Sequence, residues 1–213
     1  MNVSGMYQRA LEQAGVKNES VHHEFVTGVH GIKIDFDVTH NNRSSPLYIA
    51  GVMFKASLIM RESGGEGVIG ILGIDTGTTR HAKDVATVIT SAGFAMRAVA
   101  LTTHKRIEDG KKHIELTDET RELVSAHKIR HIAIDDDTGT TGSSTAQPVP
   151  ALRDLGVEDI SVYYDWIRNP ELPYLDELGV AYEGIIRVCL PDYEPDDCEL
   201  CDSNVPLIPY ASK

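Results

Sequence analysis

The chain has 213 residues, of which 41% are hydrophobic and 24% are charged, and these are ordinary values for a globular protein with a real core. Its formal net charge of -12 at pH 7 disfavours partners that are themselves negative, such as nucleic acids and anionic membranes. No apolar run is long enough to span a bilayer, and residues 1–15 lack an apolar signal core. We therefore expect a cytoplasmic protein with a single domain over residues 1–213.

The first half of the chain predicts helices and strands in alternation. The run 68–74 is continuously apolar, as expected of a strand that is covered on both faces. The run 32–37 alternates apolar and polar residues, which is the pattern of a half-buried strand. In chain order, the predicted elements are a helix over 6–14, extended runs over 24–28 and 32–37, a helix over 47–61, a strand over 68–74, a helix over 81–91 and a strand over 96–101.

The second half continues this alternation after a basic interruption. Residues 104–113, HKRIEDGKKH, hold six basic or histidine residues in an acidic chain, and they predict a hairpin tip or a mobile loop. Prolines at 148 and 150 predict a late or irregular start for the helix that follows residue 144, because only a first helical turn tolerates proline. The remaining elements are strands over 114–116, 132–134, 160–164 and 182–190, and helices over 119–127 and up to residue 178. Such alternation predicts an α/β protein with a doubly wound, mostly parallel sheet.

One segment, residues 130–144 with the sequence RHIAIDDDTGTTGSS, carries the most chemistry. An apolar strand ends in three aspartates and runs into a loop of glycine and small hydroxylated residues. Backbone N–H groups and hydroxyls in such a loop can form a concave anion site, and the aspartates before it can hold sugar hydroxyls or a metal ion. The loop has neither the lysine of GxxxxGK[ST] nor the spacing of GxGxxG, so a Walker loop and a dinucleotide fingerprint are excluded.

The pentapeptide DTGTT occurs twice, at 75–79 and at 137–141, each time after an apolar run. Because doubly wound sheets bind ligands at the carboxyl ends of their strands, the two copies predict a ligand with two anionic ends. Coincidence in a chain rich in threonine and glycine is the alternative. Aspartic proteases also carry two Asp-Thr-Gly motifs, but they need a β-rich fold with one aspartate in each lobe. Actin-like and chaperone ATPases have a loop similar to residues 73–79, but their fold needs a much longer chain.

The strand, the paired acids and the Thr-Gly loop resemble the phosphoribosyl diphosphate (PRPP) loop of the type I phosphoribosyltransferases, and residues 136–144 fit that pattern without a gap. The resemblance extends across nearly the whole chain and looks closest to the orotate phosphoribosyltransferases. Residues 27–31 are similar to that family's early Ser-Gly-x-His-Ser stretch, and residues 197–209 to the Cys-x-x-Cys tail of some prokaryotic members. The resemblance implies a small hood, formed by the N- and C-terminal segments, beside the main sheet.

The resemblance also implies a pentosyltransferase reaction, in which ribose 5-phosphate moves from PRPP to a pyrimidine base, favouring orotate, and pyrophosphate is released. It implies that Mg²⁺ enters with PRPP rather than through protein ligands alone, and that two subunits form a homodimer. By resemblance, the catalytic residues are Asp136, Asp137, Lys105 and Arg106, and the 5-phosphate is held by Thr138, Gly139, Thr140, Thr141, Gly142, Ser143 and Ser144. Pyrophosphate is assigned to Asp75, Thr76, Gly77, Thr78, Thr79, Lys111 and Lys112, and the base side to His30 and Lys33.

Departures from the family pattern leave alternatives open. The segment 75–79 has less glycine than the family's pyrophosphate loop, and 104–113 keeps only the basic character of its mobile loop, so the basic run could be an ordinary solvated hairpin. The chain could therefore serve another nucleobase, or sense PRPP or a nucleotide with little turnover. Cys198 and Cys201 form a single Cys-x-x-Cys pair, while zinc usually needs two more ligands and His22 and His23 are far away in sequence. We interpret the pair as a structural tail turn.

Overall fold

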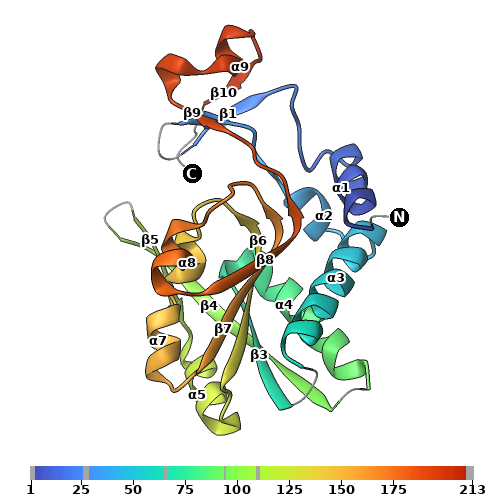
Figure 1. The fold of residues 1–213 in the computed structure, drawn as a ribbon, viewed down its shortest axis with the longest axis vertical. Helices are drawn as coiled ribbons and strands as arrows, with labels where there is room; N and C mark the ends of the chain where they lie inside the picture. Colours follow the sequence, from blue (N-terminus) through green and yellow to red (C-terminus); the bar gives the residue numbers. More distant parts are fainter. Residues whose placement is uncertain (1–2, 26–28, 65–66, 94, 109–110, 210–213) are drawn as a thin grey trace.

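The computed structural model describes residues 3–25, 29–64, 67–93, 95–108 and 111–209 (Figure 1). Its centre is a six-stranded sheet in the order β5-β4-β3-β6-β7-β8, in which neighbouring strands are parallel except for the hairpin of β4 and β5. The strands are β3 (Gly67–Gly73), β4 (Met96–Glu108), β5 (Lys111–Leu116), β6 (His131–Gly139), β7 (Asp159–Ile167) and β8 (Ala181–Arg187).

Helices cover both faces of this sheet (Figure 1). On one face α3 (Pro46–Glu62) and α4 (Asp75–Ser91) pack over a core that contains Ile71. On the other face a second core contains Leu72 and side chains of the shorter helices α5 (Asp118–His127), α6 (Ser143–Ala146), α7 (Val149–Asp154) and α8 (Pro173–Leu178). Successive residues of β3 thus enter opposite cores, which explains its continuously apolar sequence. The doubly wound, mostly parallel fold is confirmed.

A second, four-stranded sheet lies at the top of Figure 1 and is built from both ends of the chain. Its order is β10-β1-β2-β9, with β1 (His22–Glu24), β2 (His30–Gly31), β9 (Asp192–Tyr193) and β10 (Leu207–Ile208). We call the described residues of 22–31 and 192–208 the hood; the predicted hood of N- and C-terminal segments is confirmed. The remaining elements are α1 (Val3–Gln13), α2 (Asp37–His40), the 3₁₀ turn η1 (Pro195–Asp197) and α9 (Glu199–Asp202).

Residues 32–37 do not form the predicted strand, although the alternating burial of their side chains was predicted correctly. Ile32, Ile34 and Phe36 are all buried, yet within the run only Ile34 forms a bridge, to Lys17. The three side chains enter a core that includes Trp166, so packing rather than a hydrogen-bonded ladder produces the alternation. The irregular helix after residue 144 is confirmed, because α6 ends at Ala146 and α7 begins at Val149. Among the described residues, none of the helices has the length and apolar character needed to cross a membrane.

The two copies of DTGTT adopt different structures. Residues 75–79, which the resemblance assigned to a pyrophosphate-binding loop, form the first turns of α4, and only Ile74 separates them from β3. Residues 137–139 instead extend β6, where Thr138 pairs with Trp166 of β7. The copy at 137–141 lies beside β7, which offers it a pairing strand. Tertiary context rather than intrinsic preference therefore decides the structure of the pentapeptide.

Both copies nevertheless begin at adjacent strand ends. Gly73 of β3 pairs with Asp135 of β6, and the backbone N–H of Ile74 donates to the carbonyl of Asp135 at 3.2 Å. The strand order reverses between β3 and β6, since β3 continues to β4 on one side while β6 begins the other side. Ligands of doubly wound sheets bind in the crevice at such a switch point.

Candidate functional site

A small pocket opens where β6 ends, and the predicted 5-phosphate loop forms most of its wall. Its lining consists of Asp136, Thr138, Thr140, Thr141, Gly142, Ser143, Ser144, Thr145 and Tyr164. The hydroxyl oxygen of Thr138 is buried and has no hydrogen-bond partner within the described part of the chain. A buried hydroxyl without a partner is costly, so this one is available to a polar ligand. Of the predicted loop residues, Gly139 alone is not part of the lining, since it packs against Tyr164.

Neighbouring side chains hold the loop in place. Asn169 donates from Nδ2 to the carbonyl of Thr140 at 2.8 Å, and the hydroxyls of Thr145 and Tyr164 are 2.6 Å apart. Gly142 has φ of +78°, which favours glycine, and a Cβ at this position would lie 2.8 Å from Leu175. The loop is therefore a preorganised concave surface, rich in hydroxyl and N–H donors, as an anion cradle requires.

Asp136 and Asp137 stand half-buried at the end of β6. The carboxylate of Asp136 accepts a hydrogen bond from the backbone N–H of Asp137 at 3.0 Å. Burial, and then the neighbouring charge of Asp137, raise the pKa of Asp136 well above its usual range. Burial and the nearby Asp165 raise the pKa of Asp137 in the same direction. Burial and neighbouring charges thus disfavour the ionised form of both carboxyls. A ligand that brings hydroxyl donors or positive charge would stabilise that form.

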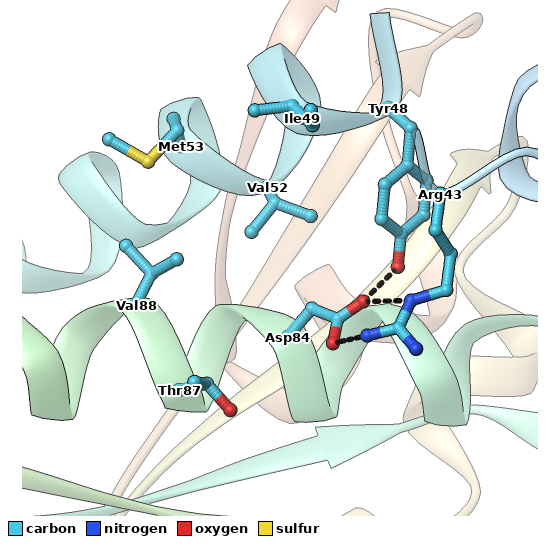
Figure 2. Close-up of a pocket in the computed structure, with 8 residues that line it drawn as sticks. All are labelled: Arg43, Tyr48, Ile49, Val52, Met53, Asp84, Thr87 and Val88. Atoms are coloured by element: carbon cyan, nitrogen blue, oxygen red, sulfur yellow. Dashed lines mark hydrogen bonds and ion pairs between the residues drawn. The ribbon is translucent and has the colours of Figure 1, made fainter. Parts of the chain in front are cut away.

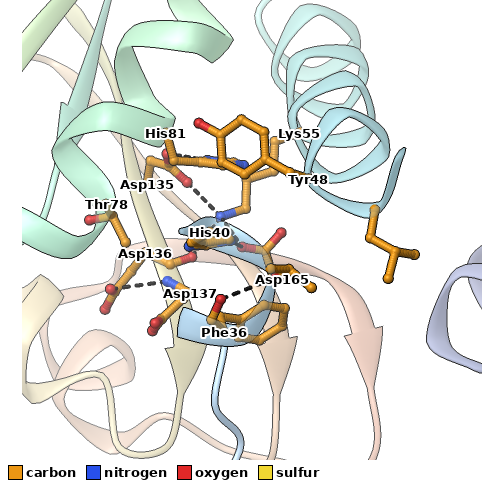
Figure 3. A network of polar contacts seen from close by, with 12 residues as sticks. Phe36, His40, Tyr48, Lys55, Thr78, His81, Asp135, Asp136, Asp137 and Asp165 are labelled. Atoms are coloured by element: carbon orange, nitrogen blue, oxygen red, sulfur yellow. Dashed lines mark hydrogen bonds and ion pairs between the residues drawn. The ribbon is translucent and has the colours of Figure 1, made fainter. Parts of the chain in front are cut away.

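Behind these carboxylates lies a buried ionic network (Figure 3) that sequence analysis missed. Lys55 of α3 is fully buried, and its Nζ lies 2.5 Å from Asp135 and 3.0 Å from Asp165. The same ammonium donates to the carbonyl of Asp136 at 2.7 Å. His81 of α4 contacts the other oxygen of Asp135 at 2.8 Å. The network therefore ties α3 and α4 to the carboxyl ends of β6 and β7.

The charges of this network support one another. Burial alone lowers the pKa of Lys55, but Asp135 and Asp165 raise it above its usual value. Burial opposes ionisation of Asp135, yet His81 and Lys55 lower the pKa of that carboxyl to about 2. Both groups thus remain charged at neutral pH. His40 stacks on His81 with ring centroids 5.1 Å apart, and it lies 3.6 Å from Asp165.

The pH dependence of stability should report on His40. Burial lowers the pKa of His40 to about 4, although Asp165 opposes the shift. The unfolded chain, where a histidine has a pKa of about 6.5, therefore binds a proton first on acidification. From pH 6.5 down to 4, this residue alone should remove about 1.4 kcal/mol of unfolding free energy per pH unit. Urea unfolding across this range should give a shallower pH slope for His40→Gln than for the native chain; parallel slopes would contradict the assignment.

The segment predicted to hold pyrophosphate lies at the amino end of α4. Gly73 allows a close approach here, because a Cβ on it would lie 2.5 Å from Cα of Thr79. Thr78 is 2% exposed and donates its hydroxyl to the carbonyl of Ile74 at 2.5 Å. The side chains of residues 75–77 lie outside the described ones. The backbone N–H groups of the first turn remain the described feature most suited to an anion, since a helix leaves them without intrahelical partners.

The basic run forms a ribbon. A hairpin is present as predicted, but residues 104–108 and 111–113, which we expected as its tip or as a mobile loop, belong to its paired strands. β4 and β5 pair antiparallel from Thr103 to Glu108, with residues 109–110 and the side chain of Lys111 outside the described part. Lys105, Arg106 and Lys112 are exposed. Arg106 forms ion pairs with Glu108 and Glu115, each at 3.0 Å. Acids of the ribbon thus hold one of the cations that we expected to be catalytic.

The two residues expected on the base side lie elsewhere than in the pocket wall. His30 is 7% exposed inside the hood, with its Nδ1 3.3 Å from Sγ of Cys201. Lys33 is exposed and pairs with Asp35 at 2.7 Å. The cysteine pair, which sequence analysis left without a histidine close in sequence, in fact lies beside His30 and His22. A base-side role for His30 and Lys33 stays a prediction.

A groove between α3 and α4 contains none of the predicted site residues (Figure 2). Its floor is apolar, and Ile49 and Met53 on α3 are about half exposed, at 51% and 53%. At one end Asp84 accepts from Tyr48 at 2.7 Å and holds Arg43 by two hydrogen bonds. Tyr48 connects this groove to the buried network, since its ring packs edge-on against His81.

Part of the chain is similar to known sequences that share one name. No model of a known protein family matches the chain. The chain is 30% identical over 82 residues to the orotate phosphoribosyltransferase of Desulforamulus reducens, a match covering 38% of this chain and 41% of that protein. It is 29% identical over 75 residues to the orotate phosphoribosyltransferase of Thermotoga maritima, covering 35% and 38% respectively. The matched region thus spans about two fifths of the length of these curated relatives.

Comparison with solved structures extends the similarity over the fold. The structure superposes on orotate phosphoribosyltransferase from Aeropyrum pernix with a TM-score of 0.58 at 14% identity, covering 84% of this chain and 92% of that one. For the Mycobacterium tuberculosis enzyme of the same name the TM-score is 0.51 at 18% identity, covering 85% and 95%. The structure therefore has the fold of these orotate phosphoribosyltransferases, and part of its sequence is similar to proteins of the same name.

Proposed function

We propose that the chain is a phosphoribosyltransferase that moves ribose 5-phosphate from PRPP to a free base, with orotate as the favoured acceptor. The observation that carries this proposal is the hydroxyl-rich pocket at the switch point, with Asp136 in its wall. A sugar phosphate matches this combination, because the loop supplies donors to the phosphate and the carboxylates accept from ribose hydroxyls. The sequence similarity to proteins named orotate phosphoribosyltransferase supports the activity and favours orotate.

In the proposed reaction the loop holds the 5-phosphate with backbone N–H groups and hydroxyls. Asp136 and Asp137 accept hydrogen bonds from the ribose hydroxyls and stabilise the positive charge that builds on the ring as the C1–O bond breaks. The amino end of α4 and the exposed lysines of the ribbon, Lys105 and Lys112, neutralise the departing pyrophosphate. The base nitrogen then bonds to C1 and gives up its proton to solvent. Catalysis in this scheme comes from positioning and preorganised charge.

The proposed substrate brings Mg²⁺ with it, and the residues present fit such an ion. Carboxylate oxygens are preferred ligands of Mg²⁺, which usually binds through one or two carboxylates together with substrate phosphates. Asp136 and Asp137 are half-buried and next to the pocket, so they could contact the ion directly or through water. When bound, Mg²⁺ would offset part of the pyrophosphate charge.

The unpaired hydroxyl of Thr138 gives a sharp test of the pocket. Thr138→Val removes a buried hydroxyl that has no partner among the described residues, so stability should be unchanged or slightly higher. If that hydroxyl donates to a phosphate, PRPP binding should weaken roughly 10- to 100-fold, as expected for a hydrogen bond to a charged group. Thermal unfolding and calorimetric titration with PRPP and Mg²⁺ measure the two quantities.

Thr145→Val provides the matched control in the same pocket. The hydroxyl of Thr145 already bonds to Tyr164 and to the carbonyl of Gly142. Its loss should therefore lower stability by about 1 kcal/mol or more while changing PRPP affinity less than Thr138→Val does. Equal effects of the two substitutions on affinity would show that Thr138 has no special contact with the ligand.

A sensor of PRPP or of a nucleotide is the second candidate function. The altered segment 75–79 favours it, because Asp75 adds negative charge where a pyrophosphate needs donors. A screen of free bases with PRPP and Mg²⁺, scored by released pyrophosphate, separates the candidates. Turnover with orotate supports the first proposal, and turnover with a different base reassigns the acceptor. Tight PRPP binding without turnover with any base supports a sensor, and absence of PRPP binding rejects both.

A homodimer belongs to this proposal as well. By resemblance, the basic ribbon of one subunit reaches the site of the other, and the exposed cations of β4 and β5 are consistent with such a role. Light scattering of the purified chain gives its mass directly. Mixing a subunit that carries a ribbon substitution with one that carries an Asp136 substitution should restore part of the activity if sites are shared between subunits.

A further inference from the structure

Four side chains with the chemistry of zinc ligands meet in the hood. They are His22 on β1, His30 on β2, Cys198 just before α9, and Cys201 within α9. Their ligand atoms all lie within 4.8 Å of one another. Nε2 of His22 and Nδ1 of His30 each lie 3.3 Å from Sγ of Cys201. The two histidines and the two cysteines come from distant parts of the chain, so the fold rather than closeness in sequence brings them together.

The geometry matches a tetrahedral ion. With Zn–S of about 2.3 Å and Zn–N of about 2.05 Å, a tetrahedral site places sulfur and nitrogen ligands about 3.5 Å apart. The two observed separations of 3.3 Å are close to that value. Two thiols and two imidazoles form a ligand set that suits zinc, whereas Mg²⁺ and Ca²⁺ prefer oxygen.

Three of the four candidate ligands are buried, and Cys201 is partly buried. His22 is 0% exposed, Cys198 2% and His30 7%, which leaves little room for a substrate. Cys198 is the N-cap of α9, and its sulfur accepts a hydrogen bond from the backbone N–H of Cys201 at 3.4 Å. This bond fixes the turn that brings the two sulfurs to the same side of the cluster.

The strands of the hood are short. Its strands have only two or three residues each. Leu207 and Ile208 on β10 are 39% and 42% exposed, so neither side chain is fully buried. Sheets of this size are marginal in water without an added staple. An ion bound to all four side chains would join β1, β2 and the C-terminal turn in one step.

We propose that His22, His30, Cys198 and Cys201 bind one structural Zn²⁺ ion that fastens the C-terminal tail to the N-terminal hairpin of the hood. Four protein ligands leave no open position, so the ion stabilises the hood and takes no part in chemistry. The proposal is independent of the proposed function, because it concerns the hood and not the phosphate pocket. It also gives Cys198 and Cys201 a role that a simple tail turn does not.

The first test measures metal in the full-length chain, purified under reducing conditions from zinc-supplemented cells. Mass spectrometry of the metal content should find about one zinc per chain, and X-ray absorption should show two sulfur and two nitrogen neighbours, at about 2.3 and 2.0 Å. Cys201→Ser and His22→Gln should each lose most of this zinc. Cys189→Ser and His23→Gln are the matched controls, since Cys189 is exposed and free, His23 neighbours His22, and neither belongs to the cluster.

The second test needs no variant, so it stands even if a substituted chain fails to fold. A zinc chelator applied to the native chain should lower its melting temperature and expose the tail to protease, and added Zn²⁺ but not Mg²⁺ should reverse both effects. Three results would overturn the proposal: no zinc in the native chain and no uptake after reduction, a disulfide between Cys198 and Cys201 as the stable form, or zinc retained in full by Cys201→Ser.

Discussion

A chain carrying Asp136→Asn together with Asp137→Asn should lose at least about 10³-fold in turnover and yet stay folded. The amides keep the shape of the carboxylates but not their charge, so the developing positive charge on the ribose ring would be left without stabilisation. The pocket wall loses no packing, because the replaced groups have nearly the same volume. Initial rates of pyrophosphate release from PRPP with orotate, at saturating Mg²⁺, measure the effect.

The same double variant should be as stable as the native chain, or more so. Burial and neighbouring acids raise the pKa of both carboxyls in the folded state. An aspartate with a raised pKa costs stability as the pH rises above its unfolded value of about 3.9, and at pH 7 a neutral amide removes this cost. Asp159→Asn is the control. Asp159 is exposed at the start of β7, away from the pocket, so its substitution should leave the rate of turnover unchanged. Full turnover in the double variant would remove both aspartates from the mechanism.

Lys55→Met should lower the free energy of unfolding by about 3–5 kcal/mol. Lys55 and its two carboxylate partners, Asp135 and Asp165, are all 0% exposed. Methionine fills the space of the lysine stem, but it leaves two carboxylates buried without their cation. Urea unfolding at pH 7 measures the loss. Because Lys55 also holds the carbonyl of Asp136, the variant that does fold should turn over more slowly.

Lys33→Met is the matched control, because it removes a lysine from an ion pair of similar length at the surface. The side chain of Lys33 is 47% exposed, and solvent screens its pair with Asp35. Its loss should cost less than about 1 kcal/mol. The penalty of Lys55→Met should also shrink as the pH falls towards 4, because carboxyls buried without their cation have raised pKa values and take up protons before those of the unfolded chain do. Equal costs for the two lysines would mean that the buried network does not contribute as described.

Much of the central sheet was predictable, because its signals are local. The continuous apolar run of β3 indicated a strand covered on both faces, and the prolines at 148 and 150 indicated the break between α6 and α7. The loop 138–144 was predictable from composition, since only glycine and small hydroxylated residues occur there, and the structure places it in a pocket wall. These features depend on residues within one turn or one strand of each other.

The hood and the metal cluster were beyond such signals. β1 pairs with β10 through His22 and Leu207. Strands of two or three residues are too short to show a hydrophobic period, so the sequence gives no sign of this pairing. Sequence analysis considered His22 and His23 as ligands and set them aside for their distance along the chain. His30, the second histidine that the fold brings to the cysteines, was interpreted as a base-side residue because of its place in a family-like segment.

The buried network did leave a trace in the sequence. Lys55 lies between Val52 and Ile59 on the helix face that α3 buries, where a charge needs a partner. Asp165 interrupts the apolar sequence of β7 in the same manner. One cation and one anion, each on a buried surface, could have been paired on these grounds. What no local pattern supplies is that the partner of Lys55 also includes Asp135, the first of three consecutive aspartates.

The origin of the hood in both ends of the chain sets the order in which a growing polypeptide can fold. Strands β3 to β8 lie in one continuous stretch, residues 67–187, and can close their two cores while the ribosome still holds the tail. Residues 22–31 emerge before this stretch, but their partners in the hood sheet, residues 192–208, emerge after it. The N-terminal hairpin therefore lacks its edge partners during the synthesis of the whole central sheet, and the hood can be completed only once residues 192–208 have emerged.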